Sequence, residues 1–431
     1  MKKYFNTLII IISFMIGLLD NKVFGQSNDG YNMIVEGYDW GPAVSKVIIE
    51  NSQKAKSVDI SQYIIEVDRS SDCVKIPESQ KKGTRTIIYG YISDENGQKS
   101  QSGTHITLVL LVGPTVSIAS PIQYSVGGTC PNNQWINYSL RIKDLTSNKI
   151  WDKKGKVIKP IVDEFDLSGK FEYEKGKSLT YASFTPKVKS NKIPLIIWLH
   201  GGGEGGLDPS IALMANKAFN YASADIQKYF GSAYVLVPQT PGAWMHNKDG
   251  VMTPGKDEDV YNVGLMALIK DFVAKHSDID VNRIYIGGCS NGGYMSLKLI
   301  LKYPKYFAAA YISALAYNSE YLSDLQIKSI KNVPIWFIHA KDDKVTKPAE
   351  TVVPVYQRLI KAGAKNVHFS YYDHVVDVTG FFGGDNFHYD GHWSWIYSHV
   401  NKVERDYDGK YVTLKGRPVT LMEWMALQKS K

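Results

Sequence analysis

The chain of 431 residues is too long for one ordinary hydrophobic core and suits two domains. With 44% hydrophobic and 21% charged residues, it has the composition of a globular protein, which excludes a disordered chain. The net charge of +8 comes from scattered lysines rather than a basic stripe, which argues against nucleic acid as a partner.

Residues 1–25 have the pattern of a signal peptide. Met1-Lys2-Lys3 provides a positive start, and residues 8–19 form an apolar segment too short to span a bilayer comfortably. Cleavage is expected after Val23-Phe24-Gly25, and no cysteine stands near that point for lipid attachment. We therefore expect an exported protein, periplasmic or extracellular, without stable membrane association after cleavage. An uncleaved membrane anchor is the alternative.

Residues 26–155 are predicted to form a first, all-β domain. Short apolar runs of strand length alternate there with turn signals such as Asn96-Gly97. Strands at this spacing are typical of a β-sandwich. The clearest runs are residues 32–36, 46–50, 86–92 and 105–112.

The chain has three cysteines, and two of them lie in this first domain. Cys73 and Cys130 could pair in an oxidising compartment. Two buried thiols are the alternative, because sequence alone cannot place the residues within bonding distance. Cys289 is expected to be a small packing residue.

A second domain is expected over residues 156–431. From about residue 185, apolar strands alternate with amphipathic segments of helical length, such as residues 257–275. This alternation predicts a doubly wound, mostly parallel sheet with helices on both faces.

A glycine-rich loop follows the first apolar run of this domain. Residues 194–199 have the length of a strand, and His200-Gly201-Gly202-Gly203-Glu204-Gly205-Gly206 comes directly after them. Such a loop lets a backbone N–H approach a substrate carbonyl oxygen, and the amide of Gly202 is the expected donor. A flexible linker is the alternative; a phosphate loop would need a Lys-Ser/Thr ending, which is absent.

Residues 284–293 predict a strand, a sharp turn that carries Ser290, and the start of a helix. Gly288-Cys289-Ser290-Asn291-Gly292 fits the G-x-S-x-G pattern of a nucleophile elbow. The neighbours of a serine on so tight a turn must lack clashing side chains, which explains the glycines. The helix N-terminus that follows favours a developing oxyanion, for which the amide of Asn291 is the other expected donor.

An acid and a histidine should follow the serine in that order. The apolar run 333–338 leads into Asp342 and Asp343. Asp343 is the expected acid; Asp342 is the reserve, with helix capping as its expected role. His392, before an aromatic helix start, is the expected general base, and His388 is expected to be a loop or pocket residue.

Three residues are candidate substrate contacts. Trp244 lies on a loop after a strand and could stack on a sugar or an aryl acyl group, Trp395 flanks the histidine, and His200 opens the glycine loop. Each tryptophan could equally be an anchor of the core. Neither His388 nor His392 has partners at recognisable metal spacing, so no metal or other cofactor is expected.

Together these motifs resemble the secreted α/β-hydrolases described as predicted peptidases or esterases. The resemblance covers residues 165–431, and residues 34–44 resemble the opening of the immunoglobulin-like domain of EstA-type bacterial esterases. It implies a two-domain carboxylesterase with Ser290, Asp343 and His392 as its triad. Gly205 follows Glu204 where such proteins commonly have an arginine, which puts a Glu–Arg clamp in doubt. The motifs are residues 200–204, 238–241, 287–293, 339–343 and 391–395.

Three functions remain open. The first is a carboxylesterase for short acyl groups or for carbohydrate-linked acetyl or feruloyl esters. The second is a serine peptidase of prolyl-oligopeptidase type, although no propeller repeats are present to filter peptides. The third is a non-catalytic, glycan-binding protein. The first domain could also bind a second subunit, so that a homo-oligomer is possible.

Overall fold

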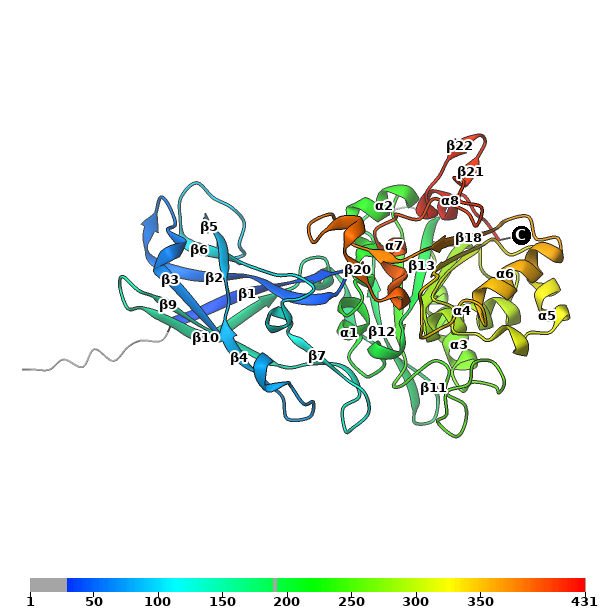
Figure 1. Cartoon of the computed structure of the whole chain (residues 1–431), viewed down its shortest axis with the longest axis horizontal. Coiled ribbons are helices and arrows are strands. Elements are labelled where there is room, and N and C mark those ends of the chain that lie inside the picture. The colour runs from blue at the N-terminus through cyan, green and yellow to red at the C-terminus, as the bar shows by residue number, and fades with distance from the viewer. Residues whose placement is uncertain (1–28, 189–191, 431) are drawn as a thin grey trace, which may run out of the picture.

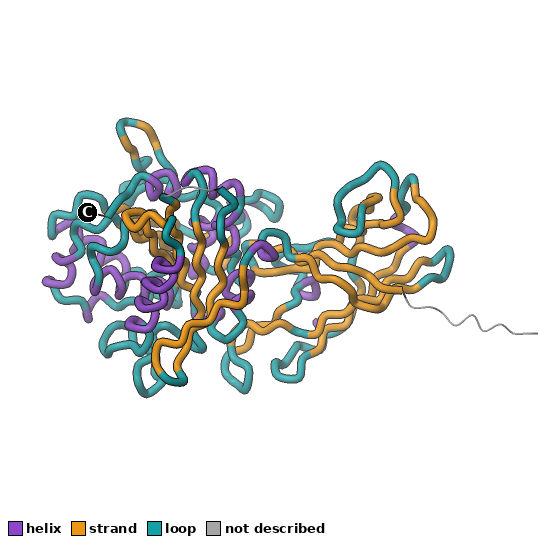
Figure 2. Tube along the Cα trace, turned by 180° about the vertical axis from the view of Figure 1, so that it is seen from behind, coloured by secondary structure: helices purple, strands orange, loops and turns teal. Residues whose placement is uncertain are grey.

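The computed structural model describes residues 29–188 and 192–430, so the predicted signal peptide lies outside the described residues. Two bodies lie side by side, a β-rich one from the N-terminal part and a mixed one from the rest (Figure 1). Most of the helices belong to the second body (Figure 2). The predicted fold class, a β-sandwich followed by an α/β-hydrolase sheet, is confirmed.

The first domain contains eight strands in one hydrogen-bonded order, β4-β3-β9-β10-β1-β2-β6-β5. The β1–β10 pair is parallel and the other neighbours are antiparallel. The four predicted strand runs fall on β1, β2, β5 and β6, and β10 continues beyond residue 155, where the sequence placed the end of the domain. The strands are β1 Asp29–Tyr38, β2 Gly41–Ala55, β3 Tyr63–Ser70, β4 Lys82–Thr84, β5 Ile87–Ser93, β6 Gly103–Leu110, β9 Asn137–Asp144 and β10 Ile150–Ile158.

Buried side chains join the two halves of this sheet into a sandwich. Arg85, between β4 and β5, donates hydrogen bonds to the carbonyl oxygens of Val44 at 3.1 Å and Leu111 at 2.9 Å, and to the Tyr138 hydroxyl. Its guanidinium is thereby satisfied in the interior, as a buried charge must be. Alternate residues of the strands, among them Val47, Ile65, Leu108 and Leu140, fill the core.

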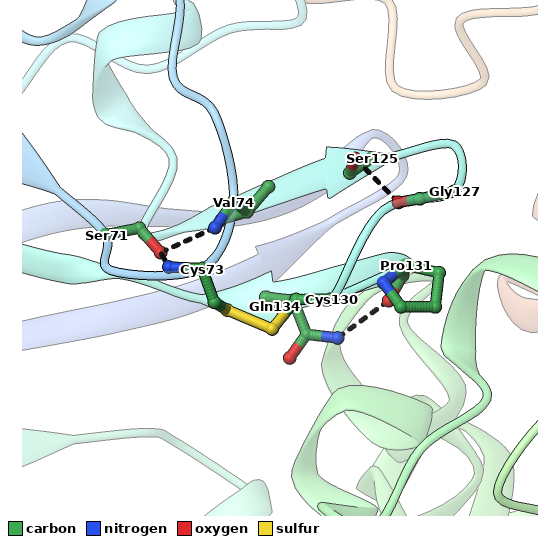
Figure 3. Close-up of a disulfide and its surroundings, with 8 residues drawn as sticks. All are labelled: Ser71, Cys73, Val74, Ser125, Gly127, Cys130, Pro131 and Gln134. Carbon is green, nitrogen blue, oxygen red and sulfur yellow. Dashed lines mark hydrogen bonds between the residues drawn. A yellow bond between two sulfur atoms is a disulfide. The ribbon is translucent and has the colours of Figure 1, made fainter.

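A separate hairpin leaves the sandwich. It consists of β7 (Ile122–Ser125) and β8 (Asn132–Trp135). Arg69 of β3 fastens its base, because the buried guanidinium donates to the carbonyl oxygens of Ser120 at 3.0 Å and Ile122 at 3.2 Å. A disulfide between Cys73 and Cys130 fastens the segment before β8 (Figure 3). The two cysteines of the first domain are therefore paired.

The second domain is built on an eight-stranded sheet in the order β11-β12-β14-β13-β15-β16-β17-β18. Strands β14 to β18 run parallel to β13, whereas β11 and β12 form an antiparallel edge. The strands are β11 Asp166–Glu174, β12 Lys177–Phe184, β13 Ile193–Leu199, β14 Tyr234–Gln239, β15 Ile279–Cys289, β16 Ala309–Ser313, β17 Ile335–Ala340 and β18 Val367–Tyr372. Short pairs complete the domain: β19 Val375–Val376 with β20 His388–Tyr389, and β21 Thr413–Leu414 with β22 Arg417–Pro418.

Helices cover both faces of this sheet. Ile196 and Trp198 of β13 pack with α1, α2, α7 and α8, whereas Leu195 and Ile197 pack with α3, α4, α5 and α6. Within residues 29–188 and 192–430, none of the helices is long and apolar enough to cross a membrane. The helices are α1 Pro209–Met214, α2 Ala224–Phe230, α3 Asn262–Lys275, α4 Asn291–Lys302, α5 Asp324–Ser329, α6 Val352–Lys361, α7 Trp395–His399 and α8 Leu421–Ala426.

One helix is shorter than its sequence pattern suggested. The pattern predicted a helix over residues 257–275, but α3 begins at Asn262. The carboxylate of Asp259 accepts hydrogen bonds from the amides of Tyr261 at 3.1 Å and Asn262 at 2.8 Å. The acid therefore satisfies free amides at the helix start instead of entering the helix.

The two domains share a packed interface around the β1–β2 turn. A side chain at Gly37 would come within 2.2 Å of the Phe219 ring, so only glycine fits there without a shift. Beside it, Lys217 forms an ion pair with the buried carboxylate of Asp39 at 2.9 Å. One continuous apolar cluster runs from the sandwich core into the α1 and α7 face of the second sheet. The domains are therefore docked through side chains of both.

Replacing both disulfide cysteines, Cys73→Ser with Cys130→Ser, should destabilise the first domain. The bridge spans 57 residues of sequence, and losing such a constraint typically costs about 2–4 kcal/mol. We expect a lower guanidinium midpoint for the double variant than for the oxidised wild type. Reduced wild type is the control and should match the variant. Equal midpoints for oxidised wild type and variant would contradict this expectation.

Candidate active site

A cavity of about 940 Å³ opens between the two domains at the carboxyl edge of the parallel sheet. Its lining includes Ser290, His392, Gly202 and Asn291 from the second domain. The first domain contributes Asp39 and Trp40 of the β1–β2 turn together with residues of the β7–β8 hairpin. Residues that are distant in the sequence thus face one space.

Ser290 sits on a strained turn between β15 and α4. Its backbone has φ 55° and ψ −119°, a conformation that residues other than glycine rarely adopt. The turn is possible because its neighbours lack side chains. A Cβ at Gly288 would lie 2.5 Å from the backbone of Gly292, and a Cβ at Gly292 would lie 2.1 Å from the carbonyl oxygen of Leu199. The serine is lifted into the cavity at the N-terminus of α4.

The glycine loop lies next to this turn. It leaves the end of β13, and Gly202–Glu204 form one short turn of 3₁₀ helix. A Cβ at Gly202 would lie 3.2 Å from the side-chain Nδ2 atom of Asn291, so the two residues expected to supply oxyanion donors are neighbours. The loop, the N-terminus of α4 and Ser290 therefore line the same cavity.

Asp343 receives the ring of His392. The Asp343 Oδ2 atom accepts a hydrogen bond from His392 Nδ1 at 2.9 Å. His392 also lines the cavity, and its other ring nitrogen, Nε2, takes no part in the bond to Asp343. Burial alone would raise the pKa of Asp343, but hydrogen bonds from His339 and His392 hold it well below its usual range. The carboxylate is therefore charged at neutral pH and fixes the imidazole.

Two further side chains hold Asp343, and the sequence reasoning missed both roles. His339 Nε2 lies 2.9 Å from Oδ2, and the Thr346 hydroxyl donates to the same oxygen at 2.7 Å. The other oxygen accepts the amides of Val345 at 2.8 Å and Thr346 at 2.9 Å. The sequence held a signal for them, since both stand close to the acid in the 339–346 segment.

Asp342 is hydrogen-bonded to a different histidine. Its Oδ2 atom accepts a hydrogen bond from His374 Nδ1 at 2.8 Å, and the ring of His374 stacks on that of His388 at 4.2 Å. The next helix, α6, begins only at Val352, so the expectation that Asp342 caps a helix is wrong. Both acids lie in the turn after β17, and of the two only Asp343 is hydrogen-bonded to His392.

The three candidate substrate contacts take different places. Trp395 lines the cavity and meets the His392 ring edge-on at 5.6 Å. Trp244 and His200 are fully buried, pack against each other at 5.1 Å, and lie outside the cavity lining. The structure thus places them in the support of the glycine loop and corrects the expected substrate contact.

His200 is locked as a neutral ring. Its Nδ1 donates to the carbonyl oxygen of Gly201 at 2.6 Å, and Nε2 accepts the amide of Thr240 at 3.2 Å. Burial lowers the pKa of His200 to about 4, so the ring does not titrate near neutral pH. Gln239 adds a hydrogen bond to the Glu204 carbonyl oxygen at 2.9 Å. The Pro238-Gln-Thr-Pro241 motif therefore holds the loop from below.

Glu204 is a buried acid within the loop. Its carboxylate accepts hydrogen bonds from the side-chain amides of Asn133 at 3.4 Å and Asn216 at 3.3 Å. Burial raises the pKa of Glu204 to about 7, against the opposing hydrogen bonds from Gly201 and Asn133. The doubted Glu–Arg clamp is thus replaced by two asparagines, one of them from the first domain.

A reactive thiol at Cys289 and a metal-binding cluster are the remaining kinds of reactive group to consider. The Cys289 thiol is buried, and burial raises its pKa well above the usual value, so it is a packing residue and not a nucleophile. No group of three or more His, Cys, Asp or Glu side chains suited to a metal ion occurs among the described residues.

Comparisons with known proteins bear on both domains. Residues 30–159 match the family described as the esterase Ig-like N-terminal domain, and residues 183–381 match the phospholipase/carboxylesterase family. The crystal structure of a thermostable esterase is similar with a TM-score of 0.72 and 23% identity, over 93% of this chain and 99% of that chain. No curated protein matches the chain.

Two other solved structures are similar only in part. An acylaminoacyl peptidase from Pyrococcus horikoshii gives a TM-score of 0.39 at 16% identity, over 58% of this chain and 44% of its own. MPT51 (FbpC1) from Mycobacterium tuberculosis gives 0.37 at 14% identity, over 55% of this chain and 97% of its own. Scores this low carry no argument about activity.

The fold and the match to the phospholipase/carboxylesterase family identify an ester-hydrolysing serine hydrolase of the α/β-hydrolase class. Within that class, the two family matches together give the chain the domain order of an EstA-type esterase, an Ig-like domain followed by a carboxylesterase domain.

The Glu204→Gln substitution should remove one pH-dependent contribution to the free energy of unfolding. Because the pKa of Glu204 is raised to about 7 in the folded protein, its contribution is complete below about pH 4.5 and is lost as the pH rises through 7. From pH 5 to pH 8 the wild type should therefore lose on the order of 2 kcal/mol relative to the variant. Urea unfolding at several pH values measures this difference.

The exposed Glu78 supplies the matched control, since its side chain is 85% exposed. The Glu78→Gln variant should follow the wild type at every pH. Parallel curves for wild type and Glu204→Gln would show that Glu204 keeps an ordinary pKa.

Proposed function

We propose that this protein is an exported serine carboxylesterase for short-chain acyl or carbohydrate-linked esters, with Ser290, His392 and Asp343 as its triad. The observation that carries the proposal is the 2.9 Å hydrogen bond from His392 Nδ1 to Asp343 Oδ2, at the edge of the cavity that Ser290 also lines. The strained serine, the oriented imidazole and the glycine loop are the parts that acyl transfer needs.

The reaction would proceed by acyl transfer through the serine. His392 Nε2 takes the proton of Ser290 as Oγ attacks the ester carbonyl, and the negative charge of Asp343 stabilises the imidazolium. The amides of Gly202 and Asn291 stabilise the oxyanion, each worth about 3 kcal/mol of barrier. The imidazolium then protonates the leaving alcohol. Water repeats the sequence on the acyl-enzyme and frees the acid.

The walls of the cavity support this substrate class. Met245, Met252 and Val345 give it apolar surface for an acyl chain. Trp40 and Trp393 also line the cavity, and tryptophan rings commonly pack against an aryl acyl group or a sugar ring. A cavity of about 940 Å³ also has room for an alcohol larger than methanol or ethanol.

A serine peptidase of prolyl-oligopeptidase type is the second candidate. The carboxylesterase family of the second domain and the small immunoglobulin-like first domain both favour an ester substrate. A non-catalytic glycan-binding role is the third candidate. The hydrogen-bonded Asp343 and His392 beside a strained serine count against it, because backbone strain of this kind is kept where a site uses it.

Export rests on the signal-peptide pattern of residues 1–25 and on the Cys73–Cys130 disulfide. Disulfides persist in oxidising compartments and are rare in the reducing cytosol. N-terminal sequencing of the protein recovered from an expressing bacterium tests this part of the proposal. A mature chain that starts at Gln26 supports cleavage, and one that starts at Met1 contradicts it.

Replacing Ser290→Ala should abolish ester hydrolysis while leaving the fold intact. We expect kcat on nitrophenyl acetate, nitrophenyl butyrate and a feruloyl ester to fall by roughly three to six orders of magnitude. Residual activity above about one per cent of wild type would contradict the assignment, because triad residues act as a unit. An acylaminoacyl nitroanilide in the same panel tests the peptidase candidate.

The two neighbouring acids offer a matched pair of variants. Asp343→Asn should lower kcat by about four orders of magnitude, because a neutral amide neither holds the imidazole in the correct tautomer nor stabilises the imidazolium. Asp342→Asn should stay within about threefold of wild type, since it contacts His374 and not His392. Steady-state kinetics on nitrophenyl butyrate measures both. Equal losses in the two variants would overturn the choice of Asp343.

A further inference from the structure

The glycine loop has few side chains of its own to hold it. Five of the seven residues from His200 to Gly206 are glycines, and glycine gains the most conformational freedom when a segment loosens. An oxyanion hole nevertheless acts only if its donors are fixed before the reaction starts. Other segments must therefore hold this loop, and the Pro238-Gln-Thr-Pro241 motif is one of them.

The β7–β8 hairpin of the first domain contacts the loop directly. The Asn133 side-chain amide donates to the Gly203 carbonyl oxygen at 2.9 Å and to Glu204 Oε1 at 3.4 Å. Its neighbour Asn132 donates to the Gly205 carbonyl oxygen at 3.2 Å. Three consecutive loop residues are thus bound from a segment about seventy positions earlier in the chain.

The hairpin packs closely against the glycine loop. A Cβ at Gly203 would lie 3.1 Å from the Asn133 amide nitrogen and 3.5 Å from the Tyr124 ring. Further along β8, Trp135 Nε1 donates to the Ser210 hydroxyl at 2.8 Å, where α1 begins. The hairpin therefore covers the loop from Gly203 to the first helix after it.

The hairpin is itself tied to the sandwich core. Arg69 holds the base of β7 through the carbonyl oxygens of Ser120 and Ile122. The disulfide holds Cys130, just before β8, against the turn that contains Cys73 (Figure 3). A chain of covalent and hydrogen bonds thus runs from the first domain to the loop.

We propose that Asn133 is a positioning residue for the oxyanion loop and that the first domain holds the Gly202 amide in place through it. The inference rests on the proposed function, since it assigns a role in the same acyl transfer. Asn133 would act through the Gly203 carbonyl and the Glu204 carboxyl, without touching the reacting atoms. Loss of this contact should loosen the donor in the transition state. Asn133 is one of many residues that line the cavity, so ground-state binding should change less.

The test compares Asn133→Ala and Asn133→Asp with Gln134→Ala. The aspartate variant keeps the shape of the asparagine but removes its donor and places a second carboxyl beside Glu204. Gln134 is the next residue on β8, and its side-chain amide donates to the Pro131 carbonyl oxygen of its own hairpin at 2.7 Å (Figure 3). Each of the three variants replaces one polar side chain on β8.

We expect both Asn133 variants to lose about 10- to 100-fold in kcat on nitrophenyl acetate, with KM within about twofold of wild type. This loss in kcat is smaller than the loss expected when an oxyanion donor is removed outright. Gln134→Ala should keep both constants. In the Asn133→Asp variant, two neighbouring carboxyls share a proton, so the pH–kcat profile should also differ from that of Asn133→Ala in the range where the pair loses that proton. A role in folding alone would lower the melting temperature and leave the pH profile of the folded fraction unchanged.

The result that overturns the inference is distinct from the one that overturns the function. If Ser290→Ala is inactive but the folded Asn133 variants keep wild-type kcat, the positioning role is wrong and the esterase stands. If Gln134→Ala loses as much kcat as Asn133→Ala, the effect belongs to the hairpin as a whole and the assignment to Asn133 is wrong. If Ser290→Ala keeps its activity, the proposed function fails first.

Discussion

The site depends on how closely the ends of β13 and β15 approach each other. At Gly292 the backbone of the elbow comes so near the carbonyl oxygen of Leu199 that a Cβ would lie 2.1 Å from it. Only glycine permits such a contact between two backbones. Because of it, the loop that leaves β13 arrives beside the serine that leaves β15. The remaining groups of the site are arranged around this contact.

The acid illustrates the second constraint, the cost of burying a charge. A carboxylate as buried as Asp343 is tolerated only if its oxygens are hydrogen-bonded. Here two backbone amides, the Thr346 hydroxyl, His339 and His392 serve that purpose. The same bonds that satisfy the charge also fix its direction, so that stability and the orientation of the base come from one set of contacts.

The immunoglobulin-like domain is part of the site and not an appended module. It lines the cavity with Asp39 and Trp40, and its hairpin covers the glycine loop. The ion pair between Asp39 and Lys217 and the close packing of Gly37 on Phe219 hold the two domains in register. The shape offered to a substrate is consequently set by both domains.

The sequence by itself determined the class of fold and the places of the reactive groups. Parallel strands end at one edge of a sheet, so the motifs after β13, β15 and β17 had to meet there. Glycine spacing marked Ser290 and Gly202, and chain order pointed to Asp343 and His392. These signals are local, because each depends on a few residues around a strand end.

Only the tertiary structure decided which side chains reach the substrate and which hold the site. Trp244 and His200 looked able to contact a ligand, yet both are buried beneath the loop. Asn133 carried no sequence signal at all, since its partner Gly203 is 70 residues away. Exposure and long-range hydrogen bonds arise when separate elements dock, and no local pattern of residues encodes that docking.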